Sequence, residues 1–222
     1  MKVWYKQSPA RFLSRRETDG SELAAAHACA VSVIIENTNY YGAKDLASSF
    51  RAVRKNTIQI AEEIPEDKYG FQPAPGTRTV AQTLVHIANV PRFNYQVLGM
   101  EKRLNMEGFD FAKMFAEMTA EEHKQRTKAA IISLLHDNGE QYAQWLETLG
   151  DEFLGQVVTF PQGAQPPSRS RFDMLLSTKE HEMHHRGQLM LVERMLGITP
   201  HLTRQMQERM AAMQRGHQGQ GA

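Results

Sequence analysis

The sequence predicts an all-α protein built as a four-helix bundle. Hydrophobic residues recur at steps of three and four over four long segments, which is the spacing of helices with one buried stripe. Strand patterns are nearly absent, since only Val157–Phe160 reads as a short extended segment, before a loop at 161–168. Because a single amphipathic helix cannot bury its stripe, the four helices are expected to pack together.

The first two helices are separated by a loop. The first helix ends at Pro65, and the segment 69–77 that follows holds two prolines and two glycines. The second helix is expected over Thr79–Gly99, with a bend at Pro91, because proline lacks an amide hydrogen and crowds the preceding turn. The stripe of the first helix consists of Leu46, Phe50, Val53, Thr57, Ile60 and Ile64.

The third and fourth helices complete the predicted bundle. The third is expected over Ala120–Leu149 and is capped by Gly150, and the fourth over Arg169–Leu196, ending at Gly197. The long link at 102–119 and the link between the third and fourth helices permit connections other than a simple up-down-up-down order. The sequence leaves that order open.

Two terminal segments are expected to lie outside the bundle. Residues 1–42 form an N-terminal extension, disordered or with one short helix, residues 43–213 form the bundle, and residues 214–222 form a disordered tail. The apolar stretch Leu23–Ile35 follows several arginines, like a signal peptide, but acidic residues lie between them and no cleavage pattern is clear. It is also shorter than the about 20 residues of a membrane span. We therefore expect a cytoplasmic protein without a membrane anchor.

The composition narrows the kinds of partner and site. Lys plus Arg number 26 against 25 Asp plus Glu, a net charge of +1, so no broad positive surface for nucleic acid or anionic lipid is expected. The single cysteine, Cys29, cannot form an intramolecular disulfide or a cysteine-rich metal site. A metal would need His, Asp or Glu, and nine histidines supply candidates.

The segment 179–189, KEHEMHHRGQL, holds the most informative histidines. At about 100° per residue, His181 and His185 lie about 40° apart on the face that carries Met174 and Val192, so both face the bundle interior. Two buried imidazoles need partners, and one shared metal ion would satisfy both. The alternative is a pair of core histidines bonded to neighbouring side chains.

A third ligand is expected from the second helix, where His86 shares its angular sector with Phe93 and Val97. Three neutral imidazoles would hold a divalent cation, zinc or nickel, and leave coordination positions open for chemistry. Thr178 and Gln188 lie on the same inward face of the fourth helix and are candidates to orient a ligand or a bound water.

The other histidines are predicted to be solvated or to lie near the termini. His184 falls at the edge of the inward face. The rest are His27, His123, His136, His201 and His217.

Residues 181–185 also spell H-E-x-x-H, the zincin signature, in which Glu182 would activate a water molecule. Glu182 falls toward the polar flank of the helix, no third ligand stands out downstream, and no sheet is predicted to hold an extended substrate. A zinc metalloprotease is therefore the less favoured interpretation. No general base is otherwise identified, and the catalytic residues stay open.

Three segments form a pattern known from a protein family. They are TVAQTLVHIANV at Thr79–Val90, VVTFPQG before the fourth helix, and HEMHHRGQLMLVERMLGITP at His181–Pro200. On these motifs, the chain from about Ala43 to Met213 resembles the DinB/YfiT-like superfamily of metal-binding four-helix bundles. The resemblance implies His86, His181 and His185 as the metal ligands, and it implies a homodimer.

The resemblance leaves two classes of function open. Characterised relatives include low-molecular-weight thiol S-transferases, and others are described as hydrolases, which implies a metal-dependent enzyme acting on a small molecule. The alternative is a non-catalytic, metal-binding stress-response bundle whose site stabilises the fold or senses metal. An open coordination position that faces a pocket would favour catalysis.

Overall fold

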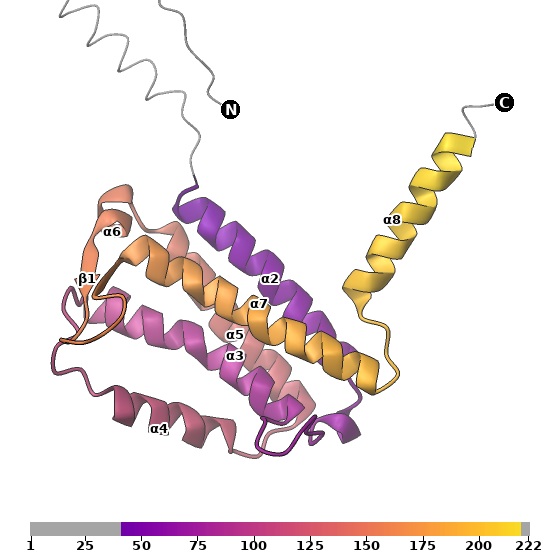
Figure 1. Cartoon of the computed structure of the whole chain (residues 1–222), viewed down its shortest axis with the longest axis horizontal. Helices are drawn as coiled ribbons and strands as arrows, with labels where there is room; N and C mark the ends of the chain where they lie inside the picture. Colours follow the sequence, from indigo (N-terminus) through magenta and orange to yellow (C-terminus); the bar gives the residue numbers. More distant parts are fainter. Residues whose placement is uncertain (1–40, 219–222) are drawn as a thin grey trace, which may run out of the picture. The chain divides into compact units, whose positions relative to one another are not determined.

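The computed structural model describes residues 41–218, and its centre is a bundle of four long helices (Figure 1). They are α2 (Ala43–Glu63), α3 (Val80–Asn94), α5 (Lys128–Glu147) and α7 (Arg171–Met195). The helices α2 and α3 each pack against both α5 and α7. The predicted four-helix bundle is thereby confirmed. In addition, α2 and α3, which follow each other in the chain, lie across a diagonal of the bundle.

The loop between α2 and α3 carries the chain across that diagonal. It contains a short 3₁₀ helix, η1 (Glu66–Lys68), and then packs back onto α2. The Tyr69 hydroxyl donates a hydrogen bond to the Ala61 carbonyl at 2.7 Å, and the Ala81 amide donates to the Tyr69 carbonyl at 2.9 Å. These bonds join the end of α2 to the start of α3, so the connection is held at both ends.

The helix α3 continues through Pro91 and changes to a π-helix, η2 (Tyr95–Met100), only after it. Because Pro91 has no amide hydrogen, the Ile87 carbonyl loses its helical partner. The Nη2 atom of Arg54 donates to that carbonyl at 3.2 Å. Arg54 therefore replaces the hydrogen bond that Pro91 removes, and the π-helical segment begins four residues after the proline, at Tyr95.

The region before α5 corrects the sequence prediction. A helix, α4 (Phe111–Glu122), occupies part of the predicted link at 102–119, and the third bundle helix begins at Lys128 instead of Ala120. Asp110 and Thr127 cap α4 and α5, each accepting a hydrogen bond from the backbone amide three residues later, at 2.8 and 3.2 Å. Periodicity alone did not show the break, because the residues on both sides of it are helical.

A small hairpin leads into α7. The short helix α6 (Asp151–Gly155) precedes the strand β1 (Val157–Thr159), which lies within the predicted extended segment. β1 pairs in antiparallel fashion with β2 (Ser168–Ser170), with Val158 opposite Arg169. The sequence did not predict β2, because Ser-Arg-Ser has no apolar alternation and its strand conformation comes from the pairing.

The C-terminal helix α8 (His201–Gln218) extends into the predicted tail at 214–222, as far as Gln218. His201, which the sequence placed at the surface, is buried with 1% exposure. Its Nε2 atom lies 3.2 Å from the Asn56 Oδ1 atom of α2. The surface assignment is wrong because the start of α8 folds against α2.

The predicted N-terminal extension, with His27 and Cys29, lies outside the described residues except for positions 41 and 42. Among the described helices, none combines the length and the apolar character that crossing a membrane requires.

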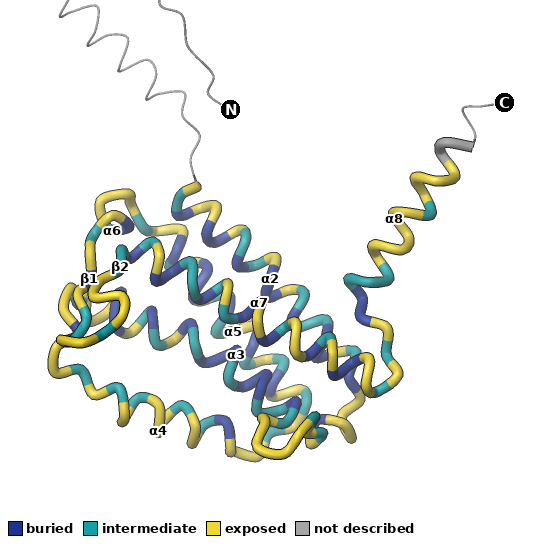
Figure 2. Tube along the Cα trace, in the orientation of Figure 1, coloured by how far each residue is buried: buried dark blue, intermediate teal, exposed yellow. Residues whose placement is uncertain are grey.

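The bundle interior consists of two apolar clusters with a polar layer between them. Figure 2 shows that buried residues recur along each of the four long helices. Along α2, Phe50 belongs to one cluster and Ile60 to the other, and the buried Arg54 lies between them. Along α7, Leu175 and Leu189 flank the buried Glu182 in the same way, and so the layer runs across the bundle.

Candidate metal centre

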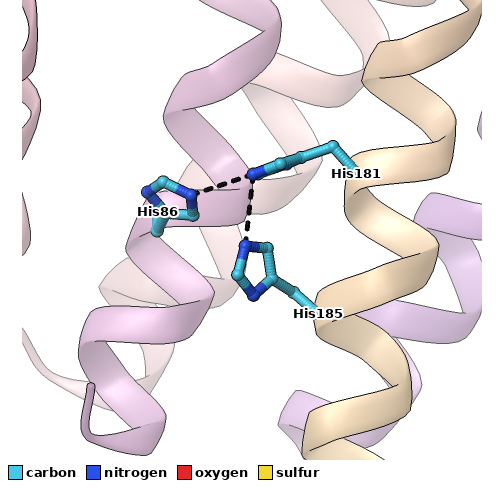
Figure 3. Close-up of side chains that lie close together, drawn as sticks. All are labelled: His86, His181 and His185. Carbon is cyan, nitrogen blue, oxygen red and sulfur yellow. Dashed lines mark hydrogen bonds between the residues drawn. The ribbon is translucent and has the colours of Figure 1, made fainter. Parts of the chain in front are cut away.

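Three histidine side chains from α3 and α7 converge on one point (Figure 3). The Nε2 atom of His181 lies 3.0 Å from Nε2 of His86 and 3.1 Å from Nε2 of His185. One ligand atom of each ring lies within 4.8 Å of the other two. His185 is buried, and the other two rings are partly buried. The structure thus brings together the three histidines selected from the sequence.

His86 is held by a carboxylate that the sequence analysis missed. Its Nδ1 atom lies 2.7 Å from Oε1 of Glu122, a buried residue at the end of α4. Arg78 holds the other side of this carboxylate, with its Nε atom 2.6 Å from Oε2. Since the carboxylate accepts the Nδ1–H hydrogen, the Nε2 lone pair of His86 faces the other histidines.

The sequence could have indicated that Glu122 needs a partner, but only if the end of α4 had been known. An acidic residue in the last turn of a helix is disfavoured by the helix dipole, so a buried one there requires a partner. The sequence analysis placed Glu122 near the start of a long helix, where an acidic residue needs no explanation.

Gln188 orients His185. Its Oε1 atom lies 2.8 Å from Nδ1 of His185, and its Nε2 atom lies 3.1 Å from Nε2 of His184. With the Gln188 amide oxygen accepting the Nδ1–H hydrogen of His185, the Nε2 lone pair of His185 also faces the cluster. The expected neighbour of the site therefore lies where it can orient one of the three rings.

Thr178 is buried in a different hydrogen-bond network. Its hydroxyl oxygen accepts hydrogen bonds from the Asn94 amide at 2.6 Å and from the Tyr142 hydroxyl at 3.1 Å. Within residues 41–218, no hydrogen bond joins Thr178 to the three histidines. It connects α3, α5 and α7 one to two turns away from them.

The donor set fits a divalent cation. The Nδ1 atom of His181 is buried without a hydrogen-bond partner, so neither tautomer satisfies it. A proton on Nε2 of His181 can be donated to only one of the two facing lone pairs and leaves the other unpaired. A proton on Nδ1 leaves three lone pairs facing one another, an arrangement that a cation satisfies. The separations of 3.0 and 3.1 Å are slightly shorter than the about 3.3–3.4 Å between two nitrogens that each lie about 2.0–2.1 Å from a tetrahedral zinc ion. All three ligand atoms lie within 4.8 Å of one another, so small side-chain shifts would place them around one ion.

Burial lowers the pKa of all three imidazoles, because the charged form is poorly solvated there. For His181 the pKa falls to about 4, with further lowering from His185 and His86. The rings are therefore neutral at physiological pH, which is the form that binds a metal ion.

Glu182, the water-activating residue of the zincin interpretation, is engaged elsewhere. It is 2% exposed, and its Oε1 and Oε2 atoms both lie 2.9 Å from nitrogens of Arg54. The prediction that Glu182 lies toward the polar flank is wrong, because Arg54 of α2 provides a buried partner. A carboxylate bound in this way does not reach a water molecule at the histidines, and this argues against the zincin arrangement.

A pocket of about 630 Å³ reaches the histidine cluster at one of its three members, His185. His185 lines it together with Gln188, Glu122, Arg78 and the exposed His123. The candidate metal centre is therefore accessible from solvent through this pocket.

Comparisons with known proteins agree with this architecture. The family model of the DinB superfamily matches residues 49–189. No curated protein matches the chain. The solved structure of a DinB-like protein from Bacillus subtilis, YjoA, has a TM-score of 0.52 and 23% identity, and the alignment covers 69% of this chain and 92% of that one.

A second solved structure is YfiT from Bacillus subtilis, described as a probable metal-dependent hydrolase with an unusual four-helix bundle topology. Its TM-score is 0.59 with 16% identity, over 74% of this chain and 93% of that one. At these identities the two structures support the fold. The family model matches more than half of the length of this chain, and the chain therefore belongs to the DinB superfamily.

Proposed function

We propose that this protein is a metal-dependent enzyme acting on a small molecule, with His86, His181 and His185 as the metal ligands. The observation that carries the proposal is the convergence of three neutral imidazoles beside a pocket. YfiT, which shares the fold, is described as a probable metal-dependent hydrolase, and hydrolysis is the reaction that we favour.

The number of ligands favours catalysis over a purely structural or sensing role. Within the described part of the chain, three His, Cys, Asp or Glu residues converge, whereas structural zinc sites have four protein ligands. Three ligands leave a position for water or substrate, and the pocket gives that position access to solvent.

The residues around the site have separate tasks in this proposal. A divalent cation, zinc or nickel, would supply a Lewis acid that lowers the pKa of a bound water or thiol. Glu122 and Gln188 keep His86 and His185 protonated on Nδ1, so that both rings offer Nε2.

Transfer of a low-molecular-weight thiol is the second candidate reaction, because the same cation would activate a thiol for attack on an electrophile. The sequence has one cysteine, Cys29, which precedes the described residues. The described site therefore contains no thiol of its own, and a thiol substrate would have to come from solution.

The ligand set is tested by elemental analysis of protein purified without an affinity tag. We expect about one metal ion per chain, and its loss in each of the variants His86→Ala, His181→Ala and His185→Ala. The matched control is His184→Ala, on the same turn, which should retain the metal. Full metal content in His86→Ala would overturn the cross-helix site.

The reaction is tested on the same protein with its metal restored. Ester and amide hydrolysis is screened first, and then conjugation of monochlorobimane with bacillithiol, mycothiol and glutathione. We expect turnover that requires the metal and is lost in His181→Ala. No metal-dependent turnover in either screen would favour the non-catalytic, metal-binding role.

We also propose that the protein is a homodimer. Light scattering on the same preparation tests this by measuring the molar mass in solution.

A further inference from the structure

Arg78, two residues before the start of α3, is the one arginine that lines the pocket at His185. Its side chain is 41% exposed, whereas the Glu122 carboxylate that it contacts is 4% exposed. Arg78 therefore lies between the buried histidine cluster and the solvent, where an entering ligand would meet it.

The guanidinium group of Arg78 keeps one edge available. Its Nε and Nη2 atoms both donate to Glu122, at 2.6 and 3.3 Å. No hydrogen bond joins its Nη1 atom to another residue within 41–218. A guanidinium carries five N–H donors, and the edge formed by Nη1 and Nη2 presents two parallel ones, which match the two oxygens of a carboxylate.

The charge around this pocket favours an anion. Glu122 is its one acidic lining residue, and Arg78 and His86 already contact that carboxylate. A divalent cation on three neutral imidazoles would leave the site with a net positive charge.

The rest of the pocket wall is partly apolar. Val80 of α3 and Leu189 and Val192 of α7 line it, and all three are buried residues of the same apolar cluster. A ligand held at Arg78 would therefore place its carbon skeleton against these side chains.

From these observations, we propose that Arg78 binds a carboxylate group of the substrate, and that the apolar part of the substrate packs on Val80, Leu189 and Val192. The inference rests on the proposed function, because it names the class of substrate for the same site. It assigns Arg78 to substrate recognition, in addition to its contact with Glu122.

Binding of phenylacetate, compared with its neutral analogue phenylacetamide, tests this inference by calorimetry on zinc-loaded protein. We expect the wild type to prefer the acid, and Arg78→Met to lose at least about tenfold in affinity for the acid, with little change for the amide. The matched control is Arg103→Met. Arg103 also contacts a glutamate through Nε, at 2.5 Å, and is 36% exposed, but it does not line this pocket.

The same titrations on metal-free protein separate this inference from the proposed function. If the wild type binds no zinc, the proposed metal centre fails, while an Arg78-dependent preference for the acid in metal-free protein would still support the present inference. Equal affinity of the wild type for acid and amide would overturn it, as would an undiminished preference in folded Arg78→Met. Urea unfolding of each variant, with a milder Arg78→Gln variant in parallel, confirms that the proteins compared are folded.

Discussion

Two buried glutamates, Glu182 and Glu122, are used in opposite ways. Glu182 is the sequence neighbour of His181, yet both of its oxygens are bound by Arg54 in the middle of the bundle. Glu122 is distant from every histidine of the site in sequence, yet it contacts His86. The comparison shows that proximity along the chain does not decide which carboxylate serves the site. The helix face and the partner on the opposite helix decide it.

The Glu182–Arg54 pair lies in a space shaped to hold it. Gly139 of α5 leaves room for the arginine, since a Cβ atom there would lie 2.9 Å from Cγ and Nη1 of Arg54. Arg54 also donates to the backbone carbonyls of Leu135 and Ile87, which joins α5 and α3 to α2. The pair therefore specifies how the four helices meet.

The Glu122–Arg78 pair is different because its arginine is partly in solvent. Glu122 has no fully buried cation beside it, and its Oε1 atom accepts the Nδ1–H hydrogen of His86. This arrangement orients an imidazole and contributes less to the stability of the fold.

The largest expected effect is on the buried pair. Glu182→Gln removes the charge that balances Arg54, which is 4% exposed, and should lower the free energy of unfolding by about 3–5 kcal/mol, measured in urea. The double variant Arg54→Met with Glu182→Leu should recover much of this loss. Zinc content per folded chain should stay unchanged. A cost under about 1 kcal/mol, or loss of zinc from a stable variant, would show that Glu182 does not have this structural role.

The second effect is on the metal site. Glu122→Gln removes the anion that polarises His86, and should weaken zinc binding by about 10- to 100-fold, measured by competition with a chelator. The matched control is Glu121→Gln, the preceding residue, whose carboxylate contacts Lys124 and Arg126 outside the site. Equal zinc affinity of the Glu122 and Glu121 variants would contradict the orienting role.

The remaining effect depends on pH and concerns a third buried glutamate, Glu193. Its side-chain oxygens have no hydrogen-bond partner within the described residues, and burial, followed by repulsion from Glu63, raises its pKa to about 7. Because the folded state keeps a proton that the unfolded state releases near the ordinary glutamate pKa of 4.5, the contribution to stability is full below that pH. It is lost as the pH rises through about 7.

Glu193→Gln therefore tests whether a buried glutamate without an arginine partner behaves as a neutral acid. We expect the wild type and the variant to be about equally stable at about pH 4.5, and the variant to be more stable by about 3 kcal/mol at about pH 9. Urea unfolding at both pH values measures this difference. A variant that is less stable than the wild type at about pH 9 would indicate that Glu193 is ionised and paired.

The sequence by itself determined the four amphipathic segments and the inward direction of His86, His181 and His185. It also placed Gln188 on the same face. These properties are local, because the helical repeat of about 3.6 residues fixes which side chains share a face before any partner is known.

Only the tertiary structure decided which groups meet across those faces. The contact of Glu122 with His86 depends on where α4 ends, and the burial of Glu182 depends on Arg54 reaching it from α2. The diagonal placement of α2 and α3 likewise depends on packing. A hydrophobic stripe predicts which face of a helix is buried. The partner of a buried charge lies on a helix far away in sequence, and only the packing of the helices brings the two together.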